Sequence, residues 1–121
     1  MSNILIIDDE GDIRLLVKSV LENEGHVVDD APGGKEGIEK IRGKKFDLVI
    51  LDFFMPGMSG REVLENIRAD PKISATKVIF MTVANFSASG LEELKKLGCI
   101  DYIQKPIDND DFVRRVSKAL E

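Results

Sequence analysis

Three short runs of apolar residues constrain the fold of this chain most strongly. They are Ile4–Ile7, Leu48–Leu51 and Val78–Met81. A strand with one solvated face alternates apolar and polar residues, whereas a strand that is apolar throughout is covered on both faces. Helices must therefore lie on both sides of the sheet that these runs form, which is the arrangement of a parallel α/β protein.

Amphipathic helical patterns separate the strand-like runs from one end of the chain to the other. Stripes at helical spacing run from Ile13 to Leu21 and from Phe112 to Leu120, and weaker ones lie between them. The five strand-like runs are Asn3–Asp8, His26–Ala31, Phe46–Leu51, Lys77–Met81 and Cys99–Gln104. Five strands alternating with five helices predict one doubly wound parallel sheet in a single domain, residues 1–121.

The order of the strands follows from their composition. The runs His26–Ala31 and Cys99–Gln104 mix polar with apolar residues, so we place them at the edges of the sheet. The predicted order is therefore 2-1-3-4-5, which is the flavodoxin-like arrangement.

Helix start and stop signals agree with this division. Ser59 and Glu62 have the spacing of a capping box, and Asp108 is placed to cap the last helix. Gly25 and Gly98 stand where helices should end.

Polar residues stand at the carboxyl ends of four predicted strands. They are Asp8 and Asp9 after the first strand, Asp52 after the third, Thr82 after the fourth and Lys105 after the fifth. Ligands of open α/β sheets bind at the carboxyl ends of the strands, where the strand order reverses. That point lies between the first and third strands here. The sequence therefore predicts that three carboxylates, a hydroxyl and an ammonium converge on one rim.

This set of groups suits phosphoryl transfer assisted by a metal ion. Neighbouring carboxylates repel one another unless a cation lies between them, and Mg²⁺ (or Mn²⁺) prefers oxygen ligands. A carboxylate can act as a nucleophile and form an acyl phosphate. Lys105 can pair with a phosphoryl oxygen, and the hydroxyl of Thr82 can donate a hydrogen bond to it.

Each of these residues has a simpler explanation when it is taken alone. An Asp pair after a strand often only begins a loop, and Asp29–Asp30 is such a pair, which we interpret as a solvated face of an edge strand. An isolated lysine such as Lys105 is usually a surface residue. The convergence of all five residues at strand ends favours a functional site.

Composition excludes several other classes. The net charge of −5 disfavours direct binding to nucleic acid, which calls for a basic face. No apolar run approaches the ~18–20 residues of a membrane-spanning helix, and the first residues lack a signal-peptide pattern. A single cysteine, Cys99, excludes an internal disulfide. These features predict a cytoplasmic protein that does not enter a membrane.

Three stretches of the chain resemble the receiver domain of bacterial two-component response regulators. They read ILIIDDEGDIRLL, DLVILDFFMPGMSGREVL and GCIDYIQKPID, and the resemblance covers essentially all 121 residues. It implies that the chain is not an enzyme beyond its own phosphoryl transfer and dephosphorylation. It also implies a histidine kinase or a histidine-phosphotransfer protein as the phosphoryl donor, and a downstream protein target.

The resemblance also implies roles for the residues of the acidic rim. Asp52 would accept the phosphoryl group. Asp9, Asp52 and the backbone carbonyl of Phe54 would hold Mg²⁺ directly, and Asp8 would contribute through a water molecule.

Other residues would bind the phosphoryl group and respond to it. Thr82 and Lys105 would bind phosphoryl oxygens, and the Lys105–Pro106 peptide would be cis. Tyr102 matches the aromatic switch position, so phosphorylation would draw Thr82 toward the phosphoryl group and turn Tyr102 inward. The surface formed by the fourth helix, fifth strand and fifth helix would then change shape.

Two positions depart from the family pattern. Val83 stands where a small residue is usual, and Phe54 stands where many relatives are polar. We hypothesise that these side chains slow the entry of attacking water and lengthen the phosphorylated state. The alternative is that both side chains point away from the site.

Two other function classes stay open at the level of the residues. One is a Mg²⁺-dependent phosphatase with an aspartyl nucleophile, although Phe54 stands where a second acid–base aspartate would be expected. The other is a nucleotide or flavin binder, although no phosphate-binding loop follows the first strand. A stand-alone regulator is favoured over a receiver cut from a longer protein.

Overall fold

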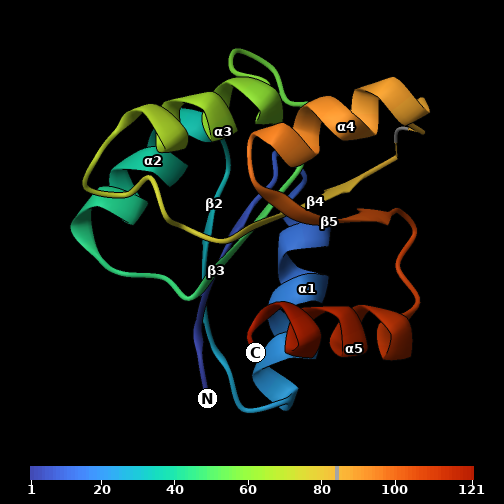
Figure 1. Ribbon diagram of the computed structural model, residues 1–121. Helices are drawn as coiled ribbons and strands as arrows, with labels where there is room; N and C mark the ends of the chain where they lie inside the picture. Colours follow the sequence, from blue (N-terminus) through green and yellow to red (C-terminus); the bar gives the residue numbers. More distant parts are fainter. Residues whose placement is uncertain (84) are drawn as a thin grey trace.

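The computed structural model describes residues 1–83 and 85–121, which form a parallel sheet between two layers of helices (Figure 1). The strands are β1 (Asn3–Ile7), β2 (Val27–Ala31), β3 (Leu48–Leu51), β4 (Val78–Thr82) and β5 (Cys99–Gln104). The helices are α1 (Gly11–Asn23), α2 (Gly34–Gly43), α3 (Gly60–Ala69), α4 (Ala88–Lys96) and α5 (Asn109–Ala119). The strand order is β2-β1-β3-β4-β5, as predicted.

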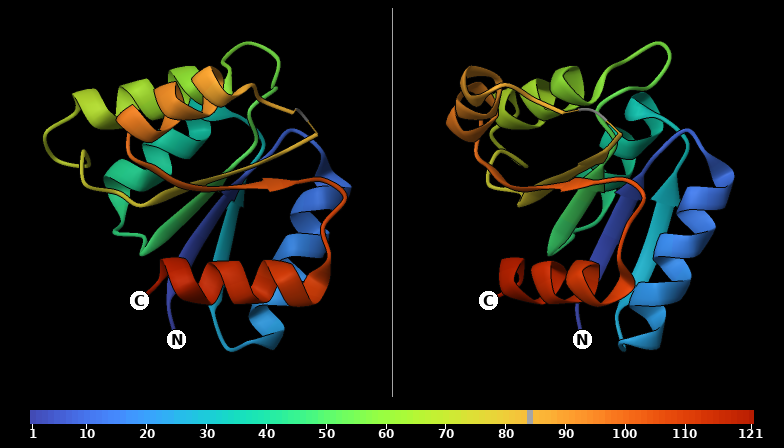
Figure 2. Two further views of the ribbon diagram at one scale, coloured as in Figure 1. Left: turned by 45° about the vertical axis from the view of Figure 1, so that its right-hand side comes forward. Right: turned by 90° about the vertical axis from the view of Figure 1, so that its right-hand side faces the viewer.

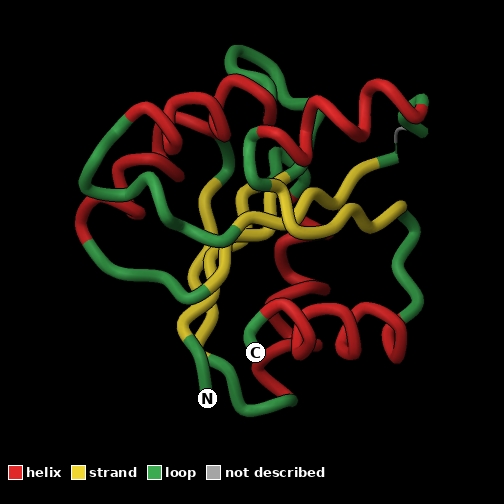
Figure 3. Tube along the Cα trace, viewed as in Figure 1, coloured by secondary structure: helices red, strands yellow, loops and turns green. Residues whose placement is uncertain are grey.

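Helices cover both faces of the sheet. Helices α2, α3 and α4 pack on one face, and α1 and α5 pack on the other, so the strands form the middle layer (Figures 2 and 3). Alternate residues of each central strand point to opposite layers: Leu5 and Ile7 belong to the core under α2 and α3, whereas Ile4 and Ile6 belong to the core under α1 and α5. The apolar composition of the central runs follows from this two-sided cover.

The central and edge strands differ in burial as predicted. Every residue of β3 and β4 is buried, and so are the last four residues of β1. The edge strands β2 and β5 each contain exposed residues, including Val27 and Ile100. The strand boundaries differ from the predicted runs by at most two residues, and β5 has the predicted bounds.

The predicted helix signals are confirmed. Ser59 and Glu62 form a reciprocal capping box at the start of α3, and the side chain of Asp108 accepts a hydrogen bond from the backbone N–H of Asp111. Gly25 and Gly98 follow the ends of α1 and α4 with φ of 89° and 81°. Glycine suits both positions because it adopts positive φ without a steric penalty.

The pair Asp29–Asp30 lies on the edge strand β2, but it is held in ion pairs rather than being simply solvated. Asp29 accepts a hydrogen bond from Lys40 at 3.0 Å, and Asp30 accepts one from Arg14 at 2.8 Å. Both aspartates thereby tie β2 to neighbouring helices, which the sequence pattern did not indicate.

The register of the sheet decides where the functional side chains lie. Ile7 at the end of β1 pairs with Leu51 at the end of β3. The residues that follow them, Asp8 and Asp52, therefore leave the sheet side by side at the point where the strand order reverses. Among the residues that the structure describes, no helix has the length and apolar character needed to cross a membrane.

Candidate functional site

Two buried aspartates form the base of the site. Asp8 is fully buried after β1, and Asp52 is 4% exposed after β3. The backbone of Asp52 stays in line with the sheet because its N–H donates to the carbonyl of Ile7 at 2.9 Å. This bond holds the backbone of Asp52 beside the end of β1.

The first residue of α3 packs directly against the backbone of this site. The N–H of Gly60 donates to the carbonyl of Phe53 at 2.7 Å. A Cβ atom at Gly60 would lie 2.3 Å from the carbonyl oxygen of Asp52 and 2.7 Å from the Cα of Phe53. Only a residue without a side chain allows α3 to approach the β3 end this closely.

Lys105 brings a cation to the two carboxylates. Its Nζ donates to Oδ2 of Asp8 at 2.7 Å and lies 3.6 Å from Oδ2 of Asp52, and its side chain is 7% exposed. The Lys105–Pro106 peptide is cis, as expected from the resemblance. The N–H of Lys105 donates to the carbonyl of Thr82 at 2.9 Å, which joins the ends of β4 and β5.

Thr82 is the last residue of β4 and is fully buried. Its position at the carboxyl end of the strand beside β3 agrees with the sequence prediction. The structure therefore brings Asp8, Asp52, Thr82 and Lys105 to one rim.

The structure adds Glu10, which the sequence reasoning did not single out. Carboxylate oxygens of Asp8, Glu10 and Asp52 lie within 4.8 Å of one another. The N–H of Glu10 donates to Oδ1 of Asp8 at 2.9 Å, and its carboxylate lies 3.4 Å from Nζ of Lys105. The signal available in the sequence was a third consecutive acidic residue in the loop after the first strand.

The other two predicted metal ligands are Asp9 and Phe54, and both residues are exposed. Asp9 is exposed and is not part of the close oxygen group formed by the described residues. Phe54 is 57% exposed, and a hydrogen bond from its backbone to Asp52 lowers the pKa of that aspartate. Three oxygen donors within reach of one ion fit the preference of Mg²⁺ for hard ligands.

Burial and charge shift two pKa values in the site. Burial raises the pKa of Asp52, and the charge of Asp8 raises it further, although Lys105 opposes both effects. Burial alone would lower the pKa of Lys105, but its hydrogen bond to Asp8 and the nearby carboxylates raise the pKa above its usual value. The site thus holds more negative charge than one ammonium can balance, which favours a bound cation.

The predicted switch residue lies on β5 and is half-buried. The ring of Tyr102 packs edge-to-face against Phe86, with centroids 5.1 Å apart. Phe86 in turn packs against Phe53, the residue after Asp52, with centroids 4.8 Å apart. These ring contacts join segments that are far apart in the sequence.

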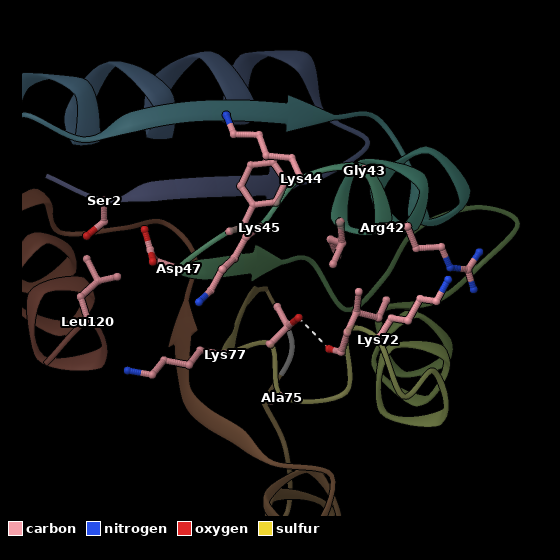
Figure 4. A pocket seen from close by; sticks show the side chains of 14 residues that line it. Ser2, Arg42, Gly43, Lys44, Lys45, Asp47, Lys72, Ala75, Lys77 and Leu120 are labelled. Atoms are coloured by element: carbon pink, nitrogen blue, oxygen red, sulfur yellow. Dashed lines mark hydrogen bonds between the residues drawn. The ribbon is translucent and has the colours of Figure 1, made fainter.

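A separate cavity lies at the opposite end of the sheet. It has a volume of about 750 Å³, and its lining includes Ser2, Asp47 and Lys77, which lie at or before the amino ends of β1, β3 and β4 (Figure 4). The acidic rim is at the carboxyl ends of the same strands. This cavity is therefore not the site of the chemistry predicted for Asp52.

Comparison with known proteins identifies the family. The family described as the response regulator receiver domain matches residues 4–117. The chain belongs to this family. It is a receiver domain of two-component response regulators, in which phosphorylation and Mg²⁺ are typical. Membership favours this class over the phosphatase and the flavin or nucleotide binder that the residues alone left open.

Curated relatives of the receiver domain fall into two length classes. The chain is 37% identical to the transcriptional regulatory protein ResD of Bacillus subtilis over 98% of its length but spans only 48% of that protein. It is 36% identical to sporulation initiation phosphotransferase F of the same organism and spans 92% of it. It is 31% identical to protein PilH of Pseudomonas aeruginosa and spans 98% of it. The chain therefore spans about half of some relatives and nearly all of others.

Solved structures agree with this assignment. Chemotaxis protein CheY4 of Vibrio cholerae has a TM-score of 0.91 and 27% identity, with 98% of each chain covered. The response regulator TrrA of Thermotoga maritima, in complex with Mg²⁺–BeF, has a TM-score of 0.83 and 36% identity, with 98% of this chain and 99% of that chain covered. Receiver domains are in general not enzymes beyond their own dephosphorylation.

Proposed function

We propose that Asp52 accepts a phosphoryl group and that Asp8, Thr82 and Lys105 serve this reaction. The observation that carries the proposal is the position of Asp52, which is buried at the end of β3 with Nζ of Lys105 at 3.6 Å. A buried carboxylate with a raised pKa has lost hydration. The ammonium of Lys105 and the other polar groups of the rim stabilise its charge in place of water.

In the transfer, a carboxylate oxygen of Asp52 forms a bond to phosphorus. The bond between phosphorus and the histidine nitrogen of the donor breaks, and its electron pair stays on the imidazole. Lys105 and the hydroxyl of Thr82 bind phosphoryl oxygens and stabilise the charge that spreads over them. Hydrolysis of the acyl phosphate by water restores Asp52, and the chain catalyses no other reaction.

Mg²⁺ or Mn²⁺ fits the oxygen donors of this rim. Asp9, Asp52 and the backbone carbonyl of Phe54 would hold it directly, and Asp8 would contribute through a water molecule. The closeness of Glu10 to Asp8 and Asp52 supports a further contribution from that carboxylate. A bound Mg²⁺ supplies positive charge that offsets the charge of the carboxylates and of the phosphoryl oxygens.

The partners follow from the same chemistry. A histidine kinase or a histidine-phosphotransfer protein donates the phosphoryl group, and a downstream protein binds the surface formed by α4, β5 and α5. A hollow of about 400 Å³ on that surface, with Leu91, Ile100 and Tyr102 in its lining, supports a protein partner.

The net charge of −5 disfavours direct contact with nucleic acid. Residues 1–121 act as one receiver domain in the cytoplasm.

Intact-mass spectrometry after incubation with acetyl phosphate tests the assignment. We expect one Mg²⁺-dependent phosphoryl adduct on the wild type and none on Asp52→Ala. The matched control is Asp110→Ala, which removes an exposed aspartate of α5 and should leave the adduct unchanged. An adduct of undiminished yield on Asp52→Ala would contradict the role of Asp52.

A further inference from the structure

A row of three aromatic rings runs from the residue after the proposed phosphorylation site to the proposed switch residue. Phe53 directly follows Asp52, Phe86 lies just before α4, and Tyr102 lies on β5. The ring centroids of Phe53 and Phe86 are 4.8 Å apart, and those of Phe86 and Tyr102 are 5.1 Å apart. Phe53 also packs on Phe80 of β4 with centroids 5.5 Å apart.

The geometry of these rings is that of specific aromatic pairs. The interplanar angles are 71° for Phe53 and Phe86 and 61° for Phe86 and Tyr102, so both pairs are close to edge-to-face. Edge-to-face pairs with centroids ~4.5–7 Å apart are favourable beyond the burial of their surface. Both ring pairs therefore favour the position that Phe86 has in the structure.

The rings of this row differ in how deeply they are buried. Phe80 is fully buried in the core under α3 and α4. Phe53, Phe86 and Tyr102 are only partly buried and pack against that core. Rings at the margin of a core can change position more easily than rings inside it, because close packing leaves no room within. A displacement of the chain at Asp52 can therefore be transmitted along the partly buried rings.

We propose that Phe86 is a positioning residue that couples Asp52 to Tyr102. This inference rests on the proposed function, in which Asp52 is phosphorylated and Tyr102 responds. Phe86 packs against Phe53, the residue next to Asp52, on one side and against Tyr102 on the other. Its ring therefore sets how strongly the position of Tyr102 depends on the state of Asp52.

The composition of the chain allows changes around Tyr102 to be followed by fluorescence. Tyr102 is the only tyrosine and the chain has no tryptophan, so the fluorescence of the protein reports on Tyr102 alone. We would measure the change in this fluorescence on adding Mg²⁺ with acetyl phosphate, and measure the phosphoryl adduct by intact mass in the same samples. The two readouts separate coupling from phosphorylation.

The test variant is Phe86→Leu, which keeps an apolar side chain and removes the ring. We expect an adduct yield like that of the wild type and loss of most of the fluorescence change. Each lost ring pair corresponds to roughly a 2- to 10-fold change in the equilibrium between the positions of Tyr102. Phe46→Leu makes the same substitution in a buried ring that lines the cavity at the opposite end of the sheet, and it should keep the full change.

The outcomes are distinguishable. A full fluorescence change in Phe86→Leu with a normal adduct would overturn the coupling role, and so would an equal loss in Phe46→Leu. If Phe86→Leu does not fold, Phe86→Met gives the same test with a flexible apolar side chain. A wild-type protein that forms no adduct on Asp52 would contradict the proposed function itself, because that result does not depend on Phe86.

Discussion

At the scale of single residues, Asp52 is held in a position that costs stability. Burial and the charge of Asp8 raise its pKa in the folded protein above the usual value of about 3.9. A group with a raised folded pKa stabilises the fold fully below its unfolded pKa, and this contribution is lost as pH rises through the folded pKa. At neutral pH the charged Asp52 therefore destabilises the metal-free protein.

We predict that Asp52→Asn raises the melting temperature of the metal-free protein at neutral pH. A gain of ~1 kcal/mol corresponds to a rise of about 4 °C for a chain of this size. The difference from the wild type should grow as pH rises above about 4 and then level off. Thermal unfolding in EDTA over a pH series measures it. Asp110→Asn is the control and should not raise the melting temperature. A lower melting temperature for Asp52→Asn would contradict the argument.

Val83 directly follows Thr82 in the sequence, and Phe54 lies two residues after Asp52. Apolar side chains therefore stand close in sequence to two residues of the acidic rim. The structure leaves Val83 65% exposed and Phe54 57% exposed, and the ring of Phe54 packs against Phe53. The rate of dephosphorylation distinguishes a role at the entrance to the site from a position directed away from it.

We predict that the double variant Val83→Ala, Phe54→Asn loses its phosphoryl group roughly 3- to 10-fold faster than the wild type. Smaller and more polar side chains admit water, and an amide can orient it toward phosphorus. The decay of the phosphorylated protein, followed by intact mass after removal of the donor, measures the rate. Val27→Ala removes an exposed valine of β2 and serves as the control. Equal rates for the double variant and the wild type would show that the two side chains do not restrict water.

At the scale of elements, the start of α3 determines how closely the helix approaches the site. A Cβ atom at Gly60 would overlap the backbone of Asp52 and Phe53. A Cβ atom at Gly43, at the end of α2, would meet no atom within 4 Å among the described residues beyond its own chain neighbours and helix backbone. These two helical glycines therefore respond differently to the same substitution.

We predict that Gly60→Ala lowers the free energy of unfolding by about 2 kcal/mol, as expected for overpacking. It should also slow formation of the phosphoryl adduct, because the backbone of Asp52 must shift. Gly43→Ala should be neutral or slightly stabilising, since alanine has the higher helix propensity. Urea unfolding and the rate of phosphorylation by acetyl phosphate measure both effects. A Gly60→Ala protein with wild-type stability would refute the close approach.

The strand-end residues of the site could be predicted because two simple rules locate them. Composition identifies the central strands, and parallel strands bring their carboxyl ends together. Asp8, Asp52, Thr82 and Lys105 each stand at such an end. The loop residue Glu10 could not be placed in this way, because periodicity describes strands and helices and not the path of a loop.

Other features depend on contacts between segments that are far apart in sequence. The approach of Gly60 to Asp52 requires the packing of α3 on the sheet. The contacts of Phe86 with Phe53 and Tyr102 require the position of the segment before α4. A pattern of apolar residues indicates that these rings are buried, but not which ring each one touches.

At the scale of the whole molecule, one side chain joins three separate segments on the face covered by α2, α3 and α4. Arg68 of α3 donates to the carbonyl of Leu97 at 2.6 Å and to that of Gly98 at 3.2 Å, after α4. It also donates to the carbonyls of Ser74 and Thr76, at 2.8 and 2.7 Å, in the loop before β4. Burial of the guanidinium lowers the pKa of Arg68.

We predict that Arg68→Met lowers the free energy of unfolding by about 3 kcal/mol, because carbonyls that bonded a charged group lose their partner. The control is Arg61→Met on the same helix. Arg61 forms surface ion pairs with Glu65 and Glu93, and such pairs contribute ~0–1 kcal/mol. Urea unfolding of both variants compares the two arginines directly. Arg68 contacts the loop before β4 and the turn before β5. The amide hydrogens of both segments should exchange faster in Arg68→Met than in the wild type, and at the wild-type rate in Arg61→Met. Equal destabilisation by the two substitutions would mean that the four backbone contacts of Arg68 contribute no more than a surface ion pair.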